Sequence, residues 1–182
     1  MPQEAVAELP YAITTSVGVV LPLSISTAAA GLYQKGFLKL PFPTNEEPDK
    51  LDRTVLVWGG SSSVGSSCIQ LAVASGAEVF VTASEKNFDY CKKLGAAQCF
   101  DYHAKDVEDQ IVNALDGKTV AGAFHATGGE DAFRSCAHIM DQTKGKAIVV
   151  TVQGVPEKGL PTSVRGKMSE SNNSVSAYKS SS

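Results

Sequence analysis

Residues 54–65 read Thr54-Val-Leu-Val-Trp58-Gly59-Gly60-Ser61-Ser62-Ser63-Val64-Gly65, a short apolar run followed by a turn rich in glycine and serine. An apolar, β-branched run of this length is typical of a buried strand. After the turn, apolar residues recur at the spacing of one helix face, at Val64, Cys68, Leu71 and Ala72. The segment therefore predicts a strand, a tight turn and a helix.

The turn itself has the character of an anion-binding site. A glycine-rich link lets the backbone approach a pyrophosphate closely, and the amide groups and positive dipole end of the following helix then face the anion. Gly65 would permit tight packing of the helix on the strand, and the hydroxyls of Ser61, Ser62 and Ser63 add donors. Because Ser62 stands where the middle glycine of the usual motif would be, the pattern alone also fits a plain tight turn capped by Ser63.

From Arg53 onward the chain alternates between strand-like and helix-like segments. Short runs with β-branched residues occupy residues 54–58, 78–82, 98–100, 120–126 and 146–152, and helical patterns occupy residues 64–75, 87–94, 105–115 and 130–140. Gly95 and Gly117 suit the ends of two of these helices. Alternating units of this kind predict parallel strands joined by right-handed crossovers. The expected fold class is α/β, a Rossmann-type doubly wound parallel sheet in three αβα layers.

The two flanks differ from this alternation. Residues 1–50 contain an apolar helical segment, about 21–35, followed by a proline-rich link. Residues 51–154 hold the dinucleotide-binding pattern. Residues 155–182 contain eight serines, two prolines and few large apolar side chains, so we expect a loose tail without a sixth strand.

Composition narrows the function class. A formal net charge of −3 and a pI near 5.6 argue against a nucleic-acid partner. The most apolar segment, residues 17–33, contains a proline and several hydroxyl residues, so we expect neither a membrane span nor a signal peptide, and a cytoplasmic protein. The four cysteines are dispersed without zinc-ligand spacing and are interpreted as small buried residues, and no metal is expected.

The end of the second predicted strand bears on the choice of cofactor. A carboxylate there usually binds the adenosine ribose of NAD. Here the strand ends in Thr82-Ala83-Ser84, and Ser84, Lys86 and Asn87 are donors suited to a 2′-phosphate, which favours NADPH. Two alternatives stay open: Glu85 could turn toward the ribose, and Ser84 could be an ordinary helix cap with Lys86 exposed.

Three segments together resemble a known family. They are residues 54–65, Leu94-Gly-Ala-Ala-Gln-Cys-Phe-Asp-Tyr102 and Leu21-Pro-Leu-Ser-Ile-Ser-Thr-Ala-Ala-Ala-Gly-Leu32. Over about residues 4–152 the chain is similar to the zinc-independent medium-chain reductases, which include quinone oxidoreductases and the trans-enoyl reductases and toxin-cluster oxidoreductases of fungi.

The resemblance implies a role for individual residues. It implies pyrophosphate contacts from Ser61–Val64 and 2′-phosphate contacts from Ser84 and Asn87 with Lys86. Tyr102 would lie by the same phosphate, Thr27 near the nicotinamide, and Thr127 beside the nicotinamide ribose. Leu23 stands where zinc-dependent relatives carry a metal-binding cysteine. Tyr102 as an edge-strand aromatic and Thr27 as a buried helix residue remain alternatives. The cofactor residues expected in all are Thr27, Gly60, Ser61, Ser62, Ser63, Val64, Gly65, Ser84, Lys86, Asn87, Tyr102 and Thr127; no catalytic acid or base is identified.

The function that the resemblance implies is NADPH-dependent hydride transfer to a small molecule, an enone, an enoyl thioester or a quinone. In that family an N-terminal GroES-like domain supplies most of the substrate pocket, so we expect this chain to bind NADPH with little turnover and to self-associate through its exposed apolar surface. A binding module without turnover is the alternative. A methyltransferase using S-adenosylmethionine is disfavoured by Thr82, and a short-chain dehydrogenase by the lack of a Tyr-x-x-x-Lys pair.

Overall fold

Thr54–Trp58 forms the central strand, β1, and all five of its residues are buried. In the computed structural model, which describes residues 8–43 and 48–169, this strand belongs to a six-stranded sheet. The other strands are β2 (Glu78–Ala83), β3 (Gln98–Asp101), β4 (Val120–His125), β5 (Ile148–Thr151) and β6 (Arg165–Met168). Burial of consecutive residues on both faces is what a sheet covered by helices on both sides requires.

The strand order is β3-β2-β1-β4-β5-β6, and every neighbouring pair is parallel. The chain moves outward from β1 to β3 and then returns to the other side of β1 to form β4. The order therefore reverses between β1 and β4, and ligands of such sheets bind at that point, outside the carboxyl ends of the strands. The doubly wound α/β fold expected from the sequence is confirmed.

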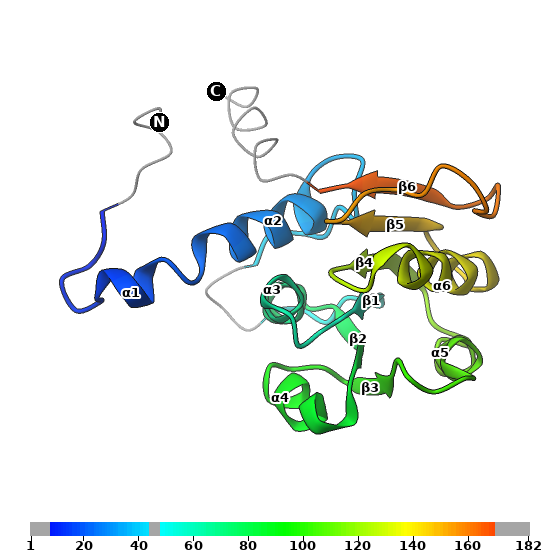
Figure 1. Cartoon of the computed structure of the whole chain (residues 1–182), viewed down its shortest axis with the longest axis horizontal. Helices are drawn as coiled ribbons and strands as arrows, with labels where there is room; N and C mark the ends of the chain where they lie inside the picture. The colour runs from blue at the N-terminus through cyan, green and yellow to red at the C-terminus, as the bar shows by residue number, and fades with distance from the viewer. Residues whose placement is uncertain (1–7, 44–47, 170–182) are drawn as a thin grey trace.

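Helices cover the two faces of the sheet (Figure 1). On one face lie α2 (Pro22–Tyr33), α3 (Ser63–Ala74) and α4 (Phe88–Lys93), and on the other lie α5 (Val107–Ala114) and α6 (Gly129–Gln142). The side chains of β1 alternate between these layers, because Val55 and Val57 pack in the first core and Leu56 and Trp58 in the second. The result is three layers with a core on each side of the sheet.

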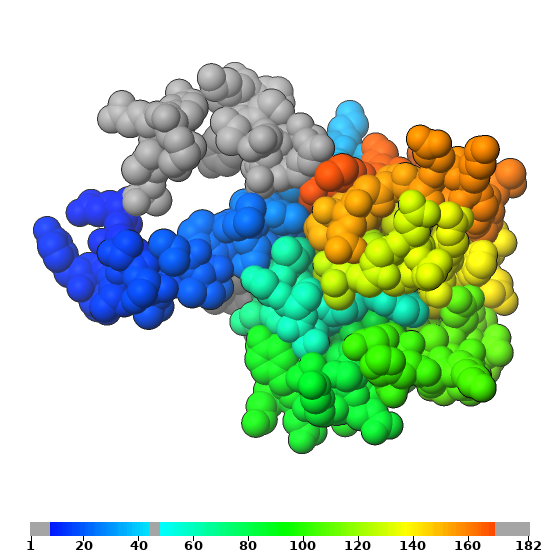
Figure 2. Space-filling model, in the orientation of Figure 1, coloured from blue at the N-terminus to red at the C-terminus, as the bar shows by residue number. Residues whose placement is uncertain are grey.

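The N-terminal flank leaves the body of the molecule. In Figure 2 the first described residues and α1 (Thr15–Gly18) project away from the sheet. Large apolar side chains on this flank are exposed, at Tyr11, Val17, Val19, Val20, Leu21 and Leu23. The far half of α2 is different, since Ala28, Leu32 and Tyr33 are buried in the core beside α3.

The segment Thr15–Tyr33 is long and apolar enough, by length and composition, to cross a membrane. A core helix of a soluble protein passes the same test, and a third of the apolar window is buried inside the protein. Packing in the sheet core accounts for the apolar residues of the far half of α2, whereas those of α1 and of the start of α2 are exposed. The expectation that it spans no membrane stays a prediction.

Each predicted strand and helix of residues 54–152 has an observed counterpart, within a few residues at its ends. Gly95 and Gly117 follow helices with φ of +106° and +73°, the left-handed conformation expected of them. Residues 85–87 form a short 3-10 helix, η2 (Glu85–Asn87), ahead of α4. Cys68, Cys91 and Cys136 are buried and unpaired, as interpreted from the sequence, whereas the unpaired Cys99 is only partly buried.

The expectation of a loose tail after Gly154 is wrong for the part of it that the structure describes. Arg165–Met168 forms β6, which pairs with β5 from Ile148↔Arg165 to Thr151↔Met168. The remainder of the predicted tail, residues 170–182, lies outside the described residues. The link from β5 to β6 contains no helix, and it contacts α6 through hydrogen bonds from Arg134 to the Lys158 carbonyl oxygen and from Ser163 to Asp141.

The packing of α3 against the turn after β1 requires a glycine at position 65. A Cβ placed on Gly65 would lie 2.2 Å from the carbonyl oxygen of Gly59 and 3.0 Å from the Cα of Gly60. Both contacts are with backbone, which cannot rotate away as a side chain can. Gly65 is therefore the position at which α3 touches the turn.

We predict that Gly65→Ala destabilises the protein, although alanine is the better helix former. Helix propensity alone would give a gain of about 1 kcal/mol. The clash with Gly59 should reverse the sign and lower the free energy of unfolding by about 1–3 kcal/mol. Urea unfolding measures this, with the exposed Ser63→Ala in the same turn as control. A Gly65→Ala protein as stable as the wild type would contradict this account of the packing.

Candidate functional site

A pocket of about 300 Å³ opens at the carboxyl ends of β1 to β4, at the point where the strand order reverses. Its walls come from the turns that follow these four strands. The lining residues are Trp58, Gly59, Ser61, Ser62, Ala83, Ser84, Asn87, Tyr102, Thr127 and Gly128. Six of the residues expected from the sequence are among them: Ser61, Ser62, Ser84, Asn87, Tyr102 and Thr127.

The first wall is the start of α3. Ser62 is its N-cap, and the Ser62 hydroxyl accepts a hydrogen bond from the amide of Gly65 at 3.0 Å. The cap is thus Ser62, and the interpretation that placed it at Ser63 is wrong by one residue. The amides of Ser63 and Val64 are at the first two helical positions, where no carbonyl of the helix can reach them. They are therefore donors available at the positive end of the helix dipole.

Thr82 ties the turn after β1 to β2. Its carbonyl oxygen accepts from the amides of Gly59 at 3.1 Å and Gly60 at 2.9 Å, and its hydroxyl accepts from Gly59 at 3.0 Å. Thr82 is fully buried and does not line the pocket. β2 continues to Ala83, so Ala83 and Ser84 occupy the place that the sequence interpretation gave to Thr82. Neither carries a carboxylate.

Asn87 connects the two turns from the other side. Its side-chain amide donates to the hydroxyl of Ser61 at 3.3 Å and to that of Ser84 at 3.0 Å. The three side chains thus form one polar cluster, which we call the Ser61–Asn87–Ser84 cluster. It holds two hydroxyl groups side by side in the pocket wall, with lone pairs and protons that can turn toward an anion.

The remaining walls are Tyr102, Trp58 and Thr127. Tyr102 follows β3, is 42% exposed, and its ring lies 4.1 Å from that of His103. On the opposite side, a Cβ at Gly59 would lie 2.3 Å from the Cγ2 of Thr127. Only glycine leaves room for that approach, so the backbone of this turn is exposed to the pocket without a covering side chain. Such a turn fits the close passage of a pyrophosphate.

The other six expected residues do not line this pocket. Gly60 and Gly65 are buried and Val64 is half-buried behind the turn. Ser63 and Lys86 are exposed to solvent. Thr27 is buried in α2, and its carbonyl oxygen accepts from the Ser169 hydroxyl at 2.8 Å. That these six residues contact the cofactor therefore stays a prediction.

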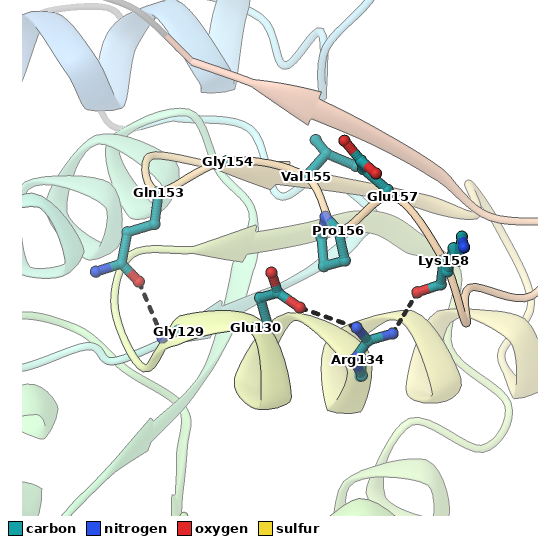
Figure 3. Close-up of a pocket in the computed structure, with 9 residues that line it drawn as sticks. All are labelled: Gly129, Glu130, Arg134, Gln153, Gly154, Val155, Pro156, Glu157 and Lys158. Atoms are coloured by element: carbon teal, nitrogen blue, oxygen red, sulfur yellow. Dashed lines mark hydrogen bonds and ion pairs between the residues drawn. The ribbon is translucent and has the colours of Figure 1, made fainter.

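A second pocket, of about 790 Å³, lies between the start of α6 and the link from β5 to β6 (Figure 3). It begins at Gly129, the residue after Gly128 of the smaller pocket. Its wall includes Gln153, whose side-chain oxygen accepts from the amide of Gly129 at 3.0 Å. Farther along α6, Arg134 pairs with Glu130 at 2.9 Å and donates to the carbonyl oxygen of Lys158.

The sequence analysis missed this second pocket. Gln153 and Gly129 sit at the carboxyl ends of β5 and β4, so their position at the ligand-binding edge follows once the strand ends are known. The signal that could have found them is the pair of glycines after Thr127 together with the polar residue that follows β5. Gly128 and Gly129 both have positive φ, 113° and 70°.

The described residues contain no group of three or more His, Cys, Asp or Glu side chains that could hold a metal ion. Leu23, which the resemblance aligns with a zinc ligand, is 69% exposed and has no atom that can ligate zinc. That the chain binds no metal stays a prediction.

His125, at the end of β4, is the one buried ionisable side chain close to both pockets in the described part of the chain. It is 1% exposed, and its Nδ1 is 2.9 Å from the Thr151 hydroxyl. Burial lowers the pKa of His125 from 6.5 to about 4. The ring is therefore neutral at physiological pH.

We predict that His125 makes the fold sensitive to mild acid. Its pKa is lower in the folded state, so between pH 6.5 and 4 the unfolded chain binds a proton that the folded chain does not. The stability is complete above pH 6.5, and the loss approaches about 3 kcal/mol as the pH nears 4. Urea unfolding of the wild type and His125→Gln at pH 7 and 4.5 should show a steeper loss in the wild type. Parallel losses in the two proteins would refute the assignment.

The chain is similar to known proteins in sequence and in structure. Residues 63–178 match the family model described as zinc-binding dehydrogenase. The dehydrogenase pigH of Monascus ruber is 44% identical over 153 residues, which are 84% of this chain and 41% of pigH. The trans-enoyl reductase himH of Aspergillus japonicus is 44% identical over 161 residues, 88% of this chain and 45% of himH. The chain thus spans less than half the length of either relative.

Solved structures share the fold. The CurK enoyl reductase superposes with a TM-score of 0.71 at 19% identity, over 94% of this chain and 49% of that one. The quinone oxidoreductase of Escherichia coli, solved in complex with NADPH, gives a TM-score of 0.65 at 20% identity, over 89% of this chain and 48% of that one. At these identities the similarity shows a common fold only, not a common activity or ligand.

Proposed function

Because the chain belongs to the zinc-binding dehydrogenase family, we propose that it is the NADP(H)-binding part of an oxidoreductase that transfers hydride to an enone, enoyl thioester or quinone. The activity of the whole protein is part of the proposal, since the chain spans less than half of the matched relatives. The names of those relatives, a dehydrogenase and a trans-enoyl reductase, support a reductase of this kind.

The observation that carries the proposal is the Ser61–Asn87–Ser84 cluster beside the N-terminus of α3. It puts hydroxyl donors and free helix amides around one pocket at the reversal of strand order. A pyrophosphate would take the amides of Ser63 and Val64, and a 2′-phosphate would take Ser84 and Asn87, with Tyr102 beside it. The absence of a carboxylate at Ala83 and Ser84 removes the group that repels this phosphate.

The larger pocket gives room for the other half of a dinucleotide. It adjoins the smaller one at Gly128 and Gly129, so a ligand that extends along the strand ends would pass from one to the other. A bound reduced nicotinamide would supply the hydride, and the chain would bind and orient it. A binding module without turnover is the second candidate, because no described residue stands out as a catalytic acid or base at the pockets.

We expect tighter binding of NADPH than of NADH. Charge-assisted hydrogen bonds to a phosphate contribute about 1.5–3 kcal/mol, so the preference should be roughly tenfold or more. Calorimetric titration measures it, and Asn87→Ala should reduce the preference, whereas Asn113→Ala, exposed on α5, should not. Equal affinities, or tighter NADH, would overturn the phosphate pocket and point to Glu85 as a ribose ligand.

We also expect the 182-residue chain to bind NADPH yet turn over slowly. Proximity and orientation account for about 7–11 kcal/mol of a barrier, and a substrate held on one side only loses most of that gain. NADPH absorbance followed with enones, quinones and enoyl thioesters should show rates barely above background. Saturable turnover would show instead that the chain forms a complete substrate pocket by itself.

We propose that this chain acts on a small-molecule substrate in the cytoplasm, without a nucleic-acid or membrane partner. The acidic composition supports the absence of nucleic acid, and the packing of the far half of α2 in the core supports a helix that does not span a membrane. The exposed apolar side chains of α1 and the start of α2, shown projecting in Figure 2, favour association of this chain with a second copy of itself.

A further inference from the structure

We propose that His125 and Thr151 are positioning residues for the nicotinamide half of the dinucleotide. They act through Gln153, which they hold in place after β5 so that its side chain contacts the first residue of α6. The inference rests on the proposed function for the identity of the ligand. The contacts that carry it belong to this chain alone.

The first contact is buried. The Nδ1 atom of His125 lies 2.9 Å from the hydroxyl of Thr151, with side chains 1% and 0% exposed. The two residues face each other across β4 and β5, where His125 and Thr151 are the last paired positions. The same hydroxyl accepts from the backbone amide of Gln153 at 3.1 Å. One proton and two lone pairs allow the hydroxyl to serve both groups.

The second contact reaches the pocket wall. The side-chain oxygen of Gln153 accepts from the amide of Gly129 at 3.0 Å, as Figure 3 shows. That amide begins α6 and has no acceptor within the helix. A series of contacts therefore runs from His125 through Thr151 and Gln153 to Gly129. It starts in the core and ends on the surface of the larger pocket.

These contacts lie beneath the junction of the two pockets. Gly128 lines the smaller pocket, Gly129 and Gln153 line the larger one, and Trp58 beside His125 in the sheet lines the smaller. A dinucleotide that crosses from its adenosine half to its nicotinamide half passes over this junction. The adenosine half meets the Ser61–Asn87–Ser84 cluster, which shares no contact with the series.

A purely structural role accounts poorly for His125. The His125 ring packs edge-on against Phe133, and its Nδ1 pairs with the buried Thr151 hydroxyl on the next strand. Two apolar side chains of the same shape could fill this place between the strands at little or no loss of stability, so the polar pair calls for an explanation. Fixing the turn after β5 at the pocket wall supplies one.

The test separates the two halves of the ligand. Calorimetry with the full 182-residue chain compares NADPH with adenosine 2′,5′-bisphosphate, which has the adenosine half and no nicotinamide. Thr151→Val, which removes the hydroxyl and keeps the shape, should weaken NADPH binding at least about fivefold and leave bisphosphate binding within about twofold. Thr54→Val is the same change at a buried residue at the amino end of the central strand β1, away from the pockets at the carboxyl ends. It removes a hydrogen bond to Glu78 and should change neither affinity.

Further variants keep the test decisive. Gln153→Leu alters an exposed side chain and should give the same selective loss even if the core variant folds poorly, and Thr151→Ser should restore NADPH affinity. His125→Gln combined with Thr151→Val should cost no more than the larger single effect, because both act through one contact. Loss of both ligands to the same degree, or no loss of NADPH in Gln153→Leu, would overturn the inference. Wild-type chain that binds neither ligand would overturn the proposed function itself.

Discussion

The close approach of α3 to the backbone after β1 is the constraint on which the site depends. Two glycines make it possible: Gly65 on the helix and Gly59 in the turn, whose carbonyl oxygen occupies the space that a Cβ of Gly65 would need. Thr82 then holds the same turn to β2 through both its carbonyl and its hydroxyl oxygen. With the turn fixed on two sides, the first amides of α3 are aimed outward at the carboxyl edge of the sheet.

Most of the fold could be predicted because its central strands are almost wholly buried, as β1, β4 and β5 show. Continuous apolar runs such as Thr54–Trp58, and helices with one apolar face such as α6, leave a strong pattern in the sequence. β6 leaves none. It lies at the edge of the sheet, none of its four residues is buried, and it reads Arg-Gly-Lys-Met. Its ladder to β5 is made by backbone groups, which any sequence carries.

The site was predictable where it follows from the turns after β1 and β2, and not where it depends on side-chain direction. Ser61, Ser84 and Asn87 lie near each other because their turns end neighbouring strands. Lys86, one position away, points elsewhere because η2 turns the backbone by a third of a circle per residue. Gln153 could not be predicted, because its position at the pocket wall depends on a hydrogen bond to the Thr151 hydroxyl and on the path of a link whose sequence has no repeating pattern.

That link, from Val152 to Val164, has a consequence for how this protein can change over evolutionary time. Elsewhere in the sheet the crossovers are helices whose inner faces fill the core, so a substitution there is felt throughout the fold. Here the crossover is an irregular segment that forms one wall of the larger pocket. Most of its side chains, among them Glu157 and Lys158, point into solvent or into the pocket. Irregular surface segments tolerate replacement and changes of length better than packed elements. Natural selection can therefore remodel this wall beyond Gln153, while Gln153, held by Thr151 and Gly129, and the helix that forms the other wall keep their sequence.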